Sequence, residues 1–133
     1  MKTAVVATVT GLVAVAVAAL LCWPSGTEPE ISTVRTAGYE VSLMVQSPKR
    51  GANTLDFEIT DLSDRPVTVD EVGVELAMPQ MGHALPPVAA TRTRQGRYRA
   101  PNVDIPMSGQ WDVTVILPGT EKVVLPLLVN ERE

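Results

Sequence analysis

The chain has 133 residues, of which 45% are hydrophobic and 4% aromatic, and its formal net charge is −4. Because the chain is acidic, poor in aromatic residues and without a basic tail, we expect no nucleic acid among its partners. Its single cysteine excludes an intrachain disulfide, so packing must stabilise the fold.

An uncharged, mainly aliphatic segment opens the chain. Residues 4–23 follow the lone charge of Lys2 and are long enough to span a bilayer core. The positive flank predicts a single-pass protein of the cytoplasmic membrane with its domain on the extracytoplasmic side, and residues 1–23 as anchor or signal segment. Two alternatives remain open. One is a cleaved secretory signal, and the other is a lipoprotein signal ending at Cys22, although Leu21 stands where a small residue is normally needed.

The residues after this segment are predicted to form a linker and one domain. Residues 24–38 are rich in Pro, Ser, Thr, Gly and Glu, a composition typical of a linker. Residues 39–133 have the length of a single domain with one core.

Within the domain, alternating apolar and polar residues predict half-buried β-strands, and no helical pattern is visible. We expect an all-β fold of about seven strands after one N-terminal transmembrane helix, as an immunoglobulin-like β-sandwich or a small Greek-key barrel. Pro126 predicts that the last strand lies at a sheet edge. The expected strands are 41–45, 55–59, 67–76 with a β-bulge near residues 70–71, 91–94, 97–100, 111–115 and 123–129.

A two-residue hairpin loop is predicted at Gln95-Gly96, where glycine permits a positive φ. It would pair Arg94 with Arg97 and Arg92 with Arg99, so that four arginines share one face. Opposed like charges are destabilising. Either neighbouring carboxylates or splaying into water relieves the repulsion, or the arginines bind an anionic surface such as lipid headgroups or an acidic partner.

The loop after the third predicted strand contains Met78, Met81 and His83, the only histidine of the chain. Two thioethers and an imidazole are neutral, soft or borderline ligands that suit Cu(I) better than hard cations. If strand directions alternate, the loop that contains Met107 lies at the same end of the domain as the loop of Met78, Met81 and His83. The linker then joins the domain at the opposite end. The alternative is that Met78 and Met81 fill the end of the core and His83 is solvated.

Two aromatic residues near these loops are expected to point inward. Trp111 is predicted to anchor the core, with a role as a cap over a Cu(I) site as the alternative. Tyr98 falls on the inward side of its strand, whereas Met44 falls on the outward side and has no predicted role.

The region from residue 78 to residue 115 carries the most distinctive sequence motifs. It contains Met-Pro-Gln-Met-Gly-His at 78–83, Gly-Arg-Tyr at 96–98 and Pro-Met-Ser-Gly-Gln-Trp-Asp-Val at 106–113. In these motifs the chain resembles the YtkA-like domain family and, more distantly, FixH-type proteins.

That resemblance implies a small exported β-sandwich that handles copper. It maps the copper ligands onto Met78, Met81, His83 and Met107, while Ala84-Leu85 offers no further ligand. We expect no enzyme, because no nucleophile with a fixed partner and no phosphate-binding loop is visible.

The expected function is that of a membrane-anchored, extracytoplasmic protein that sequesters or transfers Cu(I), for tolerance or for oxidase assembly. Its expected partners are the membrane and a copper transporter or oxidase subunit. The alternative is a metal-free immunoglobulin-like accessory module that docks on a membrane complex.

Overall fold

A computed structural model of the protein describes residues 29–131. Its regular elements in this range are β-strands and two short 3-10 turns, which confirms the predicted all-β fold. No helix within the described range is long and apolar enough to cross a membrane. The predicted membrane segment, residues 1–23 with Cys22, lies outside the described residues.

The described part of the chain contains nine strands instead of the seven predicted. They are β1 (Glu30–Arg35), β2 (Tyr39–Val45), β3 (Gly51–Asp61), β4 (Glu71–Met78), β5 (His83–Ala84), β6 (Val88–Arg94), β7 (Arg97–Ile105), β8 (Gly109–Ile116) and β9 (Lys122–Val129). The 3-10 turns are η1 (Pro79–Met81) and η2 (Pro118–Thr120).

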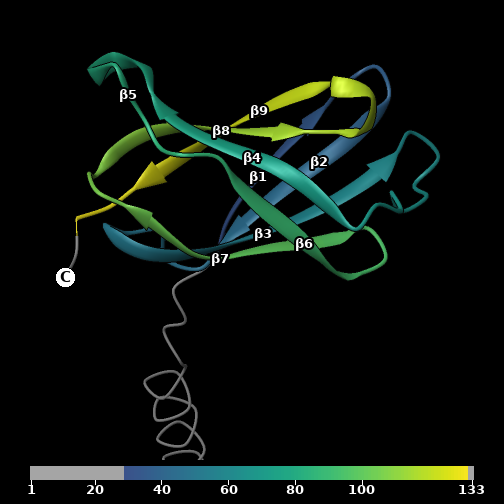
Figure 1. Ribbon diagram of the computed structural model, residues 1–133, viewed down its shortest axis with the longest axis horizontal. Coiled ribbons are helices and arrows are strands. Elements are labelled where there is room, and N and C mark those ends of the chain that lie inside the picture. Colours follow the sequence, from purple (N-terminus) through teal and green to yellow (C-terminus); the bar gives the residue numbers. More distant parts are fainter. Residues whose placement is uncertain (1–28, 132–133) are drawn as a thin grey trace, which may run out of the picture.

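All nine strands belong to one antiparallel sheet that curls on itself (Figure 1). The strand order is β1-β2-β3-β7-β6-β4-β8-β9, and β5 adds to β4 outside this path. The terminal strands β1 and β9 contact each other, and the amide of Leu128 donates to Oε1 of Glu30 at 3.2 Å. The architecture is therefore a flattened, nearly closed barrel, and β9 with Pro126 lies at the end of the strand order, as predicted.

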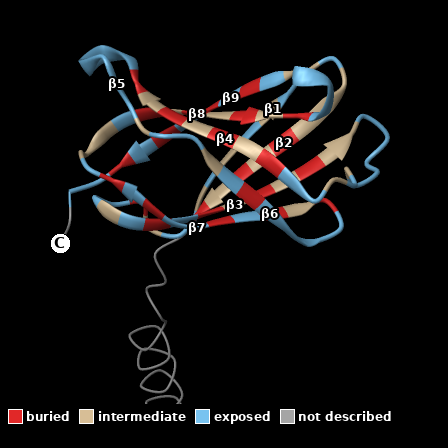
Figure 2. Cartoon of the chain, viewed as in Figure 1, coloured by how far each residue is buried: buried red, intermediate tan, exposed pale blue. Residues whose placement is uncertain are grey.

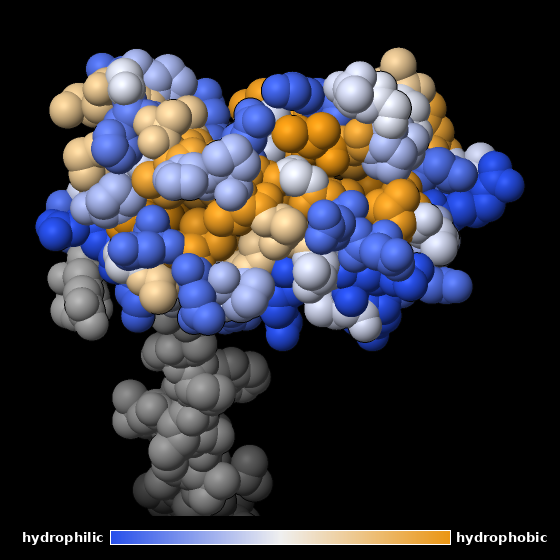
Figure 3. Space-filling view, in the orientation of Figure 1, coloured by the Kyte–Doolittle hydropathy of each residue, from blue (hydrophilic) through white to orange (hydrophobic). Residues whose placement is uncertain are grey.

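The core forms because inward positions alternate with outward ones along each strand, as the colours of Figure 2 show. Trp111, Tyr98 and Phe57 are the largest fully buried side chains, so the inward placement of Trp111 and Tyr98 is confirmed. Met44 faces outward on β2 and is half-buried. In the view of Figure 3, hydrophobic residues form a band across the middle of the molecule, with hydrophilic residues around it.

Strand β1 lies within residues 24–38, so the linker prediction is wrong for residues 30–35. The strand pairs with β2 over its whole length, from Glu30 opposite Val45 to Arg35 opposite Glu40. Its start therefore lies at the same end of the barrel as the end of β4 and the start of β8. The extra strand reverses the predicted arrangement, in which the linker joined the domain at the end opposite the methionine loops.

The segment predicted as the first half of the third strand is a loop instead. Residues 62–70 connect β3 to β4. They pair with a strand at one isolated bridge, between Pro66 and Thr60. The buried hydroxyl of Tyr98 donates to the carbonyl of Val67 at 2.7 Å and accepts from the amide of Val69 at 3.2 Å. These bonds satisfy backbone groups that would otherwise pair with a neighbouring strand. The β-bulge predicted near residues 70–71 is absent, because β4 begins at Glu71.

The β6–β7 hairpin is present, with a register that differs from the prediction. Arg94 pairs with Arg97 as expected, but a shift at Thr93 places Arg92 opposite Tyr98 and Thr91 opposite Arg99. Three of the four arginines therefore have outward positions on this face, and Arg92 does not join them.

Candidate metal site

Met78 and His83 face each other across a tight hairpin. Strand β4 ends at Met78, η1 begins with a proline at its first position, and Gly82 ends the turn in the left-handed conformation with φ 61°. The chain then returns as β5, in which His83 pairs with Met78. Directly paired residues in an antiparallel ladder lie on the same face of the sheet, so both side chains belong to the inner side of this end of the barrel.

Met78 is the most buried of the four predicted ligands, with 5% of its surface exposed. A Cβ placed on Gly109 would lie 3.2 Å from the terminal methyl carbon of Met78. The thioether of Met78 is therefore packed against the beginning of β8, directly after the turn that carries Met107.

Met107 lies in the short connection between β7 and β8. It is half-buried and packs against the core. The indole Nε1–H of Trp111 donates to the carbonyl oxygen of Met107 at 3.0 Å, which fixes the backbone of this turn. The two methionine loops lie at the same end of the barrel, as the alternation of strand directions predicts.

The imidazole of His83 contacts the indole of Trp111. The two ring centroids are 6.1 Å apart and the ring planes form an angle of 84°. Trp111 itself is fully buried, whereas His83 is exposed to solvent on its other side. The indole is thus buried beneath this end of the barrel, and the imidazole lies between the indole and solvent.

Met81 is placed differently from the other three residues. It ends η1 and 67% of its surface is exposed. The structure therefore brings Met78, His83 and Met107 to the end of the barrel at which Trp111 is buried, and leaves Met81 exposed on the η1 turn. We name the four residues Met78, Met81, His83 and Met107 the methionine rim.

One interaction at this end has no signal in the sequence. The hydroxyl of Ser108 donates to Oε1 of Glu131, and Nη1 of Arg50 lies 3.3 Å from Oε2 of the same carboxylate. The Ser108 hydrogen bond, with a smaller contribution from Arg50, lowers the pKa of Glu131 below its usual value. Residues distant in sequence thereby fix the turn next to Met107, and no local pattern could have indicated this contact.

Harder metal ligands do not gather in the described part of the chain. Among residues 29–131, no group of three or more His, Cys, Asp and Glu side chains is placed to hold a metal ion. A metal site at the methionine rim would depend on thioether sulfur, a donor that favours Cu(I) and is a poor ligand for hard divalent cations.

Comparison with known proteins identifies the family of the chain. The YtkA-like family model matches residues 33–116, more than half of the chain. The chain belongs to the YtkA-like family. The matched part of this YtkA-like protein runs from β1 through β8 and includes the whole methionine rim, while β9 lies beyond it. No curated protein and no solved structure matches the chain significantly.

Proposed function

We propose that this YtkA-like protein is anchored to the cytoplasmic membrane by residues 4–23 and binds Cu(I) on the extracytoplasmic side through the methionine rim. It sequesters the ion or transfers it to a membrane partner, either a copper transporter or an oxidase subunit. Copper is cargo in this proposal, and the protein has no catalytic role.

The arrangement around Trp111 is the observation that carries the proposal. Two neighbouring loops bring three of the four residues to one end of the barrel: Met78 pairs with His83, His83 contacts the buried indole of Trp111, and the backbone carbonyl of Met107 accepts the indole N–H. Their donor atoms are two thioether sulfurs and an imidazole nitrogen, a neutral set suited to a soft monovalent ion. The exposed Met81 provides a donor that an incoming ion meets first.

A metal-free accessory module is the second candidate, and one observation favours it. Met78 is buried and Met107 packs against the core, as flexible apolar residues do when they only fill space. In that case the sulfur atoms have no ligand function, and the exposed part of the rim contacts a membrane complex.

Competition for Cu(I) distinguishes the two candidates. Residues 24–133 are titrated against a chromogenic Cu(I) chelator, in parallel with the triple variant Met78→Leu, Met81→Leu, His83→Ala. We expect the wild-type domain to withdraw Cu(I) from the chelator and the triple variant to lose this ability. Equal, weak competition by both proteins would favour the metal-free module.

A matched control comes from Met44, which lies on the outer face of β2, away from the rim. Met44→Leu removes one thioether and should leave the competition unchanged. Because Met→Leu exchanges nearly conserve volume, each should cost less than about 1.5 kcal/mol. His83 is exposed, so its truncation to alanine leaves no cavity in the core.

The anchor is tested independently of copper with the full chain. Membrane fractions are washed with alkaline carbonate and the N-terminus of the retained protein is determined by mass spectrometry. An intact N-terminus in the pellet supports the anchor. A chain that starts near residue 24 in the soluble fraction supports a cleaved signal, and a lipid-modified Cys22 supports a lipoprotein.

A further inference from the structure

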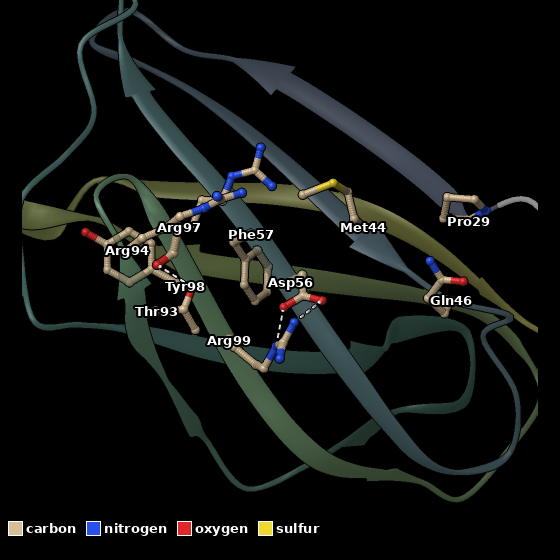
Figure 4. A pocket seen from close by; sticks show the side chains of 10 residues that line it. All are labelled: Pro29, Met44, Gln46, Asp56, Phe57, Thr93, Arg94, Arg97, Tyr98 and Arg99. Carbon is tan, nitrogen blue, oxygen red and sulfur yellow. Dashed lines mark hydrogen bonds and ion pairs between the residues drawn. The ribbon is translucent and has the colours of Figure 1, made fainter.

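A groove crosses the outer face of β2, β3, β7 and β6, and its volume is about 360 Å³. Figure 4 shows Pro29, Met44 and Gln46 towards one end of this groove, Arg94 and Arg97 towards the other, and the pair of Asp56 and Arg99 between them. We call it the arginine groove. It lies on the outside of the barrel and shares no residue with the methionine rim.

The strand register arranges apolar and cationic side chains in order across this face. Ile31 pairs with Met44, Met44 with Asp56, and Asp56 with Arg99. Directly paired residues lie on the same face, so the row runs from two apolar side chains to a guanidinium group. The apolar end is open to solvent, since 61% of Ile31 is exposed.

The cationic end of the groove has more arginines than carboxylates. Nε of Arg99 lies 2.7 Å from Oδ1 of Asp56, and Nη2 of Arg97 lies 2.8 Å from Oε2 of Glu58. Arg94 pairs directly with Arg97 and forms no ion pair within the described range. Two opposed cations that share one carboxylate repel each other, and an added anion would relieve this repulsion.

We propose that the arginine groove binds the phosphate group of an anionic phospholipid in the membrane that anchors the chain. The planar guanidinium group forms paired hydrogen bonds with phosphate oxygens, and Arg94 with Arg97 provides two such groups side by side. Ile31 and Met44, at the apolar end of the row, contact the apolar region below the headgroups. In this arrangement the domain lies with the outer face of β2, β3, β7 and β6 towards the bilayer.

The position of Pro29 supports this occupant over a soluble anion. Pro29 lines the groove, and five residues, 24–28, separate it from the predicted membrane segment. Five residues span at most about 18 Å when fully extended, so an anchored chain keeps this face close to the lipid surface. The inference rests on the proposed anchor for its geometry and is independent of copper.

The net negative charge of the chain does not prevent such binding. At physiological ionic strength the Debye length is about 8 Å, so carboxylates on the opposite layer of the barrel are largely screened. A cation near an anionic membrane surface contributes about a fivefold increase in binding.

Vesicle flotation with residues 24–133 and no metal tests the proposal. The ladder partners of all nine strands lie within residues 29–131, so this part carries its own complete sheet and core. We expect it to float with vesicles of phosphatidylcholine mixed with phosphatidylglycerol, to float less at high salt, and not to float with phosphatidylcholine alone. Arg94→Gln should weaken binding about fivefold, and Arg94→Gln with Arg97→Gln still more.

Lys122→Gln is the matched control, because Lys122 is an exposed cation on β9, outside the groove. It changes the net charge by the same amount and should leave flotation unchanged. Absent binding of the wild type to anionic vesicles, or equal losses in Arg94→Gln and Lys122→Gln, would overturn the proposal. Neither result bears on the Cu(I) titration, so failure of this inference and failure of the proposed function are separable.

Discussion

The imidazole of His83 stands nearly perpendicular to the indole of Trp111, with 6.1 Å between the ring centroids. Residues 24–133 contain Trp111 as their only tryptophan, so all tryptophan emission comes from the indole that His83 contacts. We expect Cu(I) bound at the methionine rim to change the fluorescence of Trp111, and His83→Ala to weaken that response. A titration followed by emission checks this, and a response that survives intact in His83→Ala would place the ion elsewhere.

Gly109→Ala should destabilise the domain for two separable reasons. Gly109 has a φ of +123°, which a residue with a side chain rarely adopts, and the new Cβ would lie 3.2 Å from the methyl carbon of Met78. Backbone strain of this kind costs about 1–3 kcal/mol. Urea unfolding of Gly109→Ala, alone and with Met78→Leu, measures the two effects. Partial recovery in the double variant is expected, because leucine lacks the terminal methyl group and the φ strain remains.

Tyr98→Phe should loosen the loop of residues 62–70. The substitution leaves the carbonyl of Val67 and the amide of Val69 without the hydroxyl that both contact. A buried unsatisfied polar group costs about 1–3 kcal/mol, and because Val67 and Val69 are half-buried the free energy of unfolding should fall by no more than this amount. Hydrogen exchange should speed up at the Val69 amide, while amides of the β8–β9 ladder should change only with global stability. A uniform change across the domain would contradict this local role.

Asp61→Asn should alter the pH dependence of stability. Hydrogen bonds from the backbone amides of Arg65 and Ser63, with the Arg65 guanidinium, hold the pKa of Asp61 below its ordinary value of 3.8. A carboxyl whose pKa is lowered on folding stabilises the protein above the ordinary pKa, and this contribution disappears as the pH falls through the folded value.

Unfolding midpoints measured at neutral pH and below pH 3.8 provide the test for Asp61. The variant should be less stable than the wild type at neutral pH, and the difference should shrink in acid. Asp64→Asn, on the same turn, is the control with the same charge change. A deficit of Asp61→Asn that stays constant over this pH range would show that the ionised carboxylate is not responsible.

The sequence was sufficient for most of the sheet because the inward positions of β2, β3, β8 and β9 are nearly all apolar. Strand β1 was missed because its pattern is inverted. Its burial alternates, but Glu30 and Ser32 occupy half-buried positions while Ile31 is exposed. Pairing with β2 and contact with β9 explain why this segment is extended, and residues 30–35 alone carry no signal for either.

The four predicted ligands stay a prediction, and their arrangement could be predicted only in part. Alternating strand directions suffice to bring the loop of Met78 and the loop of Met107 to one end of the barrel. The contact of His83 with Trp111 depends on the paired hairpin after β4, whereas the hydrogen bond to the Met107 carbonyl forms within the turn between β7 and β8. The shift at Thr93 that separates Arg92 from the other arginines breaks the regular pairing that was assumed for a two-residue hairpin.

The hydrogen bond from Leu128 to Glu30 places the first and last strands together at the end of the barrel that carries the methionine rim. A domain whose two ends emerge side by side can be inserted into a surface loop of another protein without disturbing its own sheet. For the same reason its ends can be joined and the chain reopened at the exposed η2 turn, between β8 and β9, to give a circular permutant. Such a permutant would retain every strand pair and lose only the η2 connection, and its new ends would lie at the end of the barrel opposite the rim.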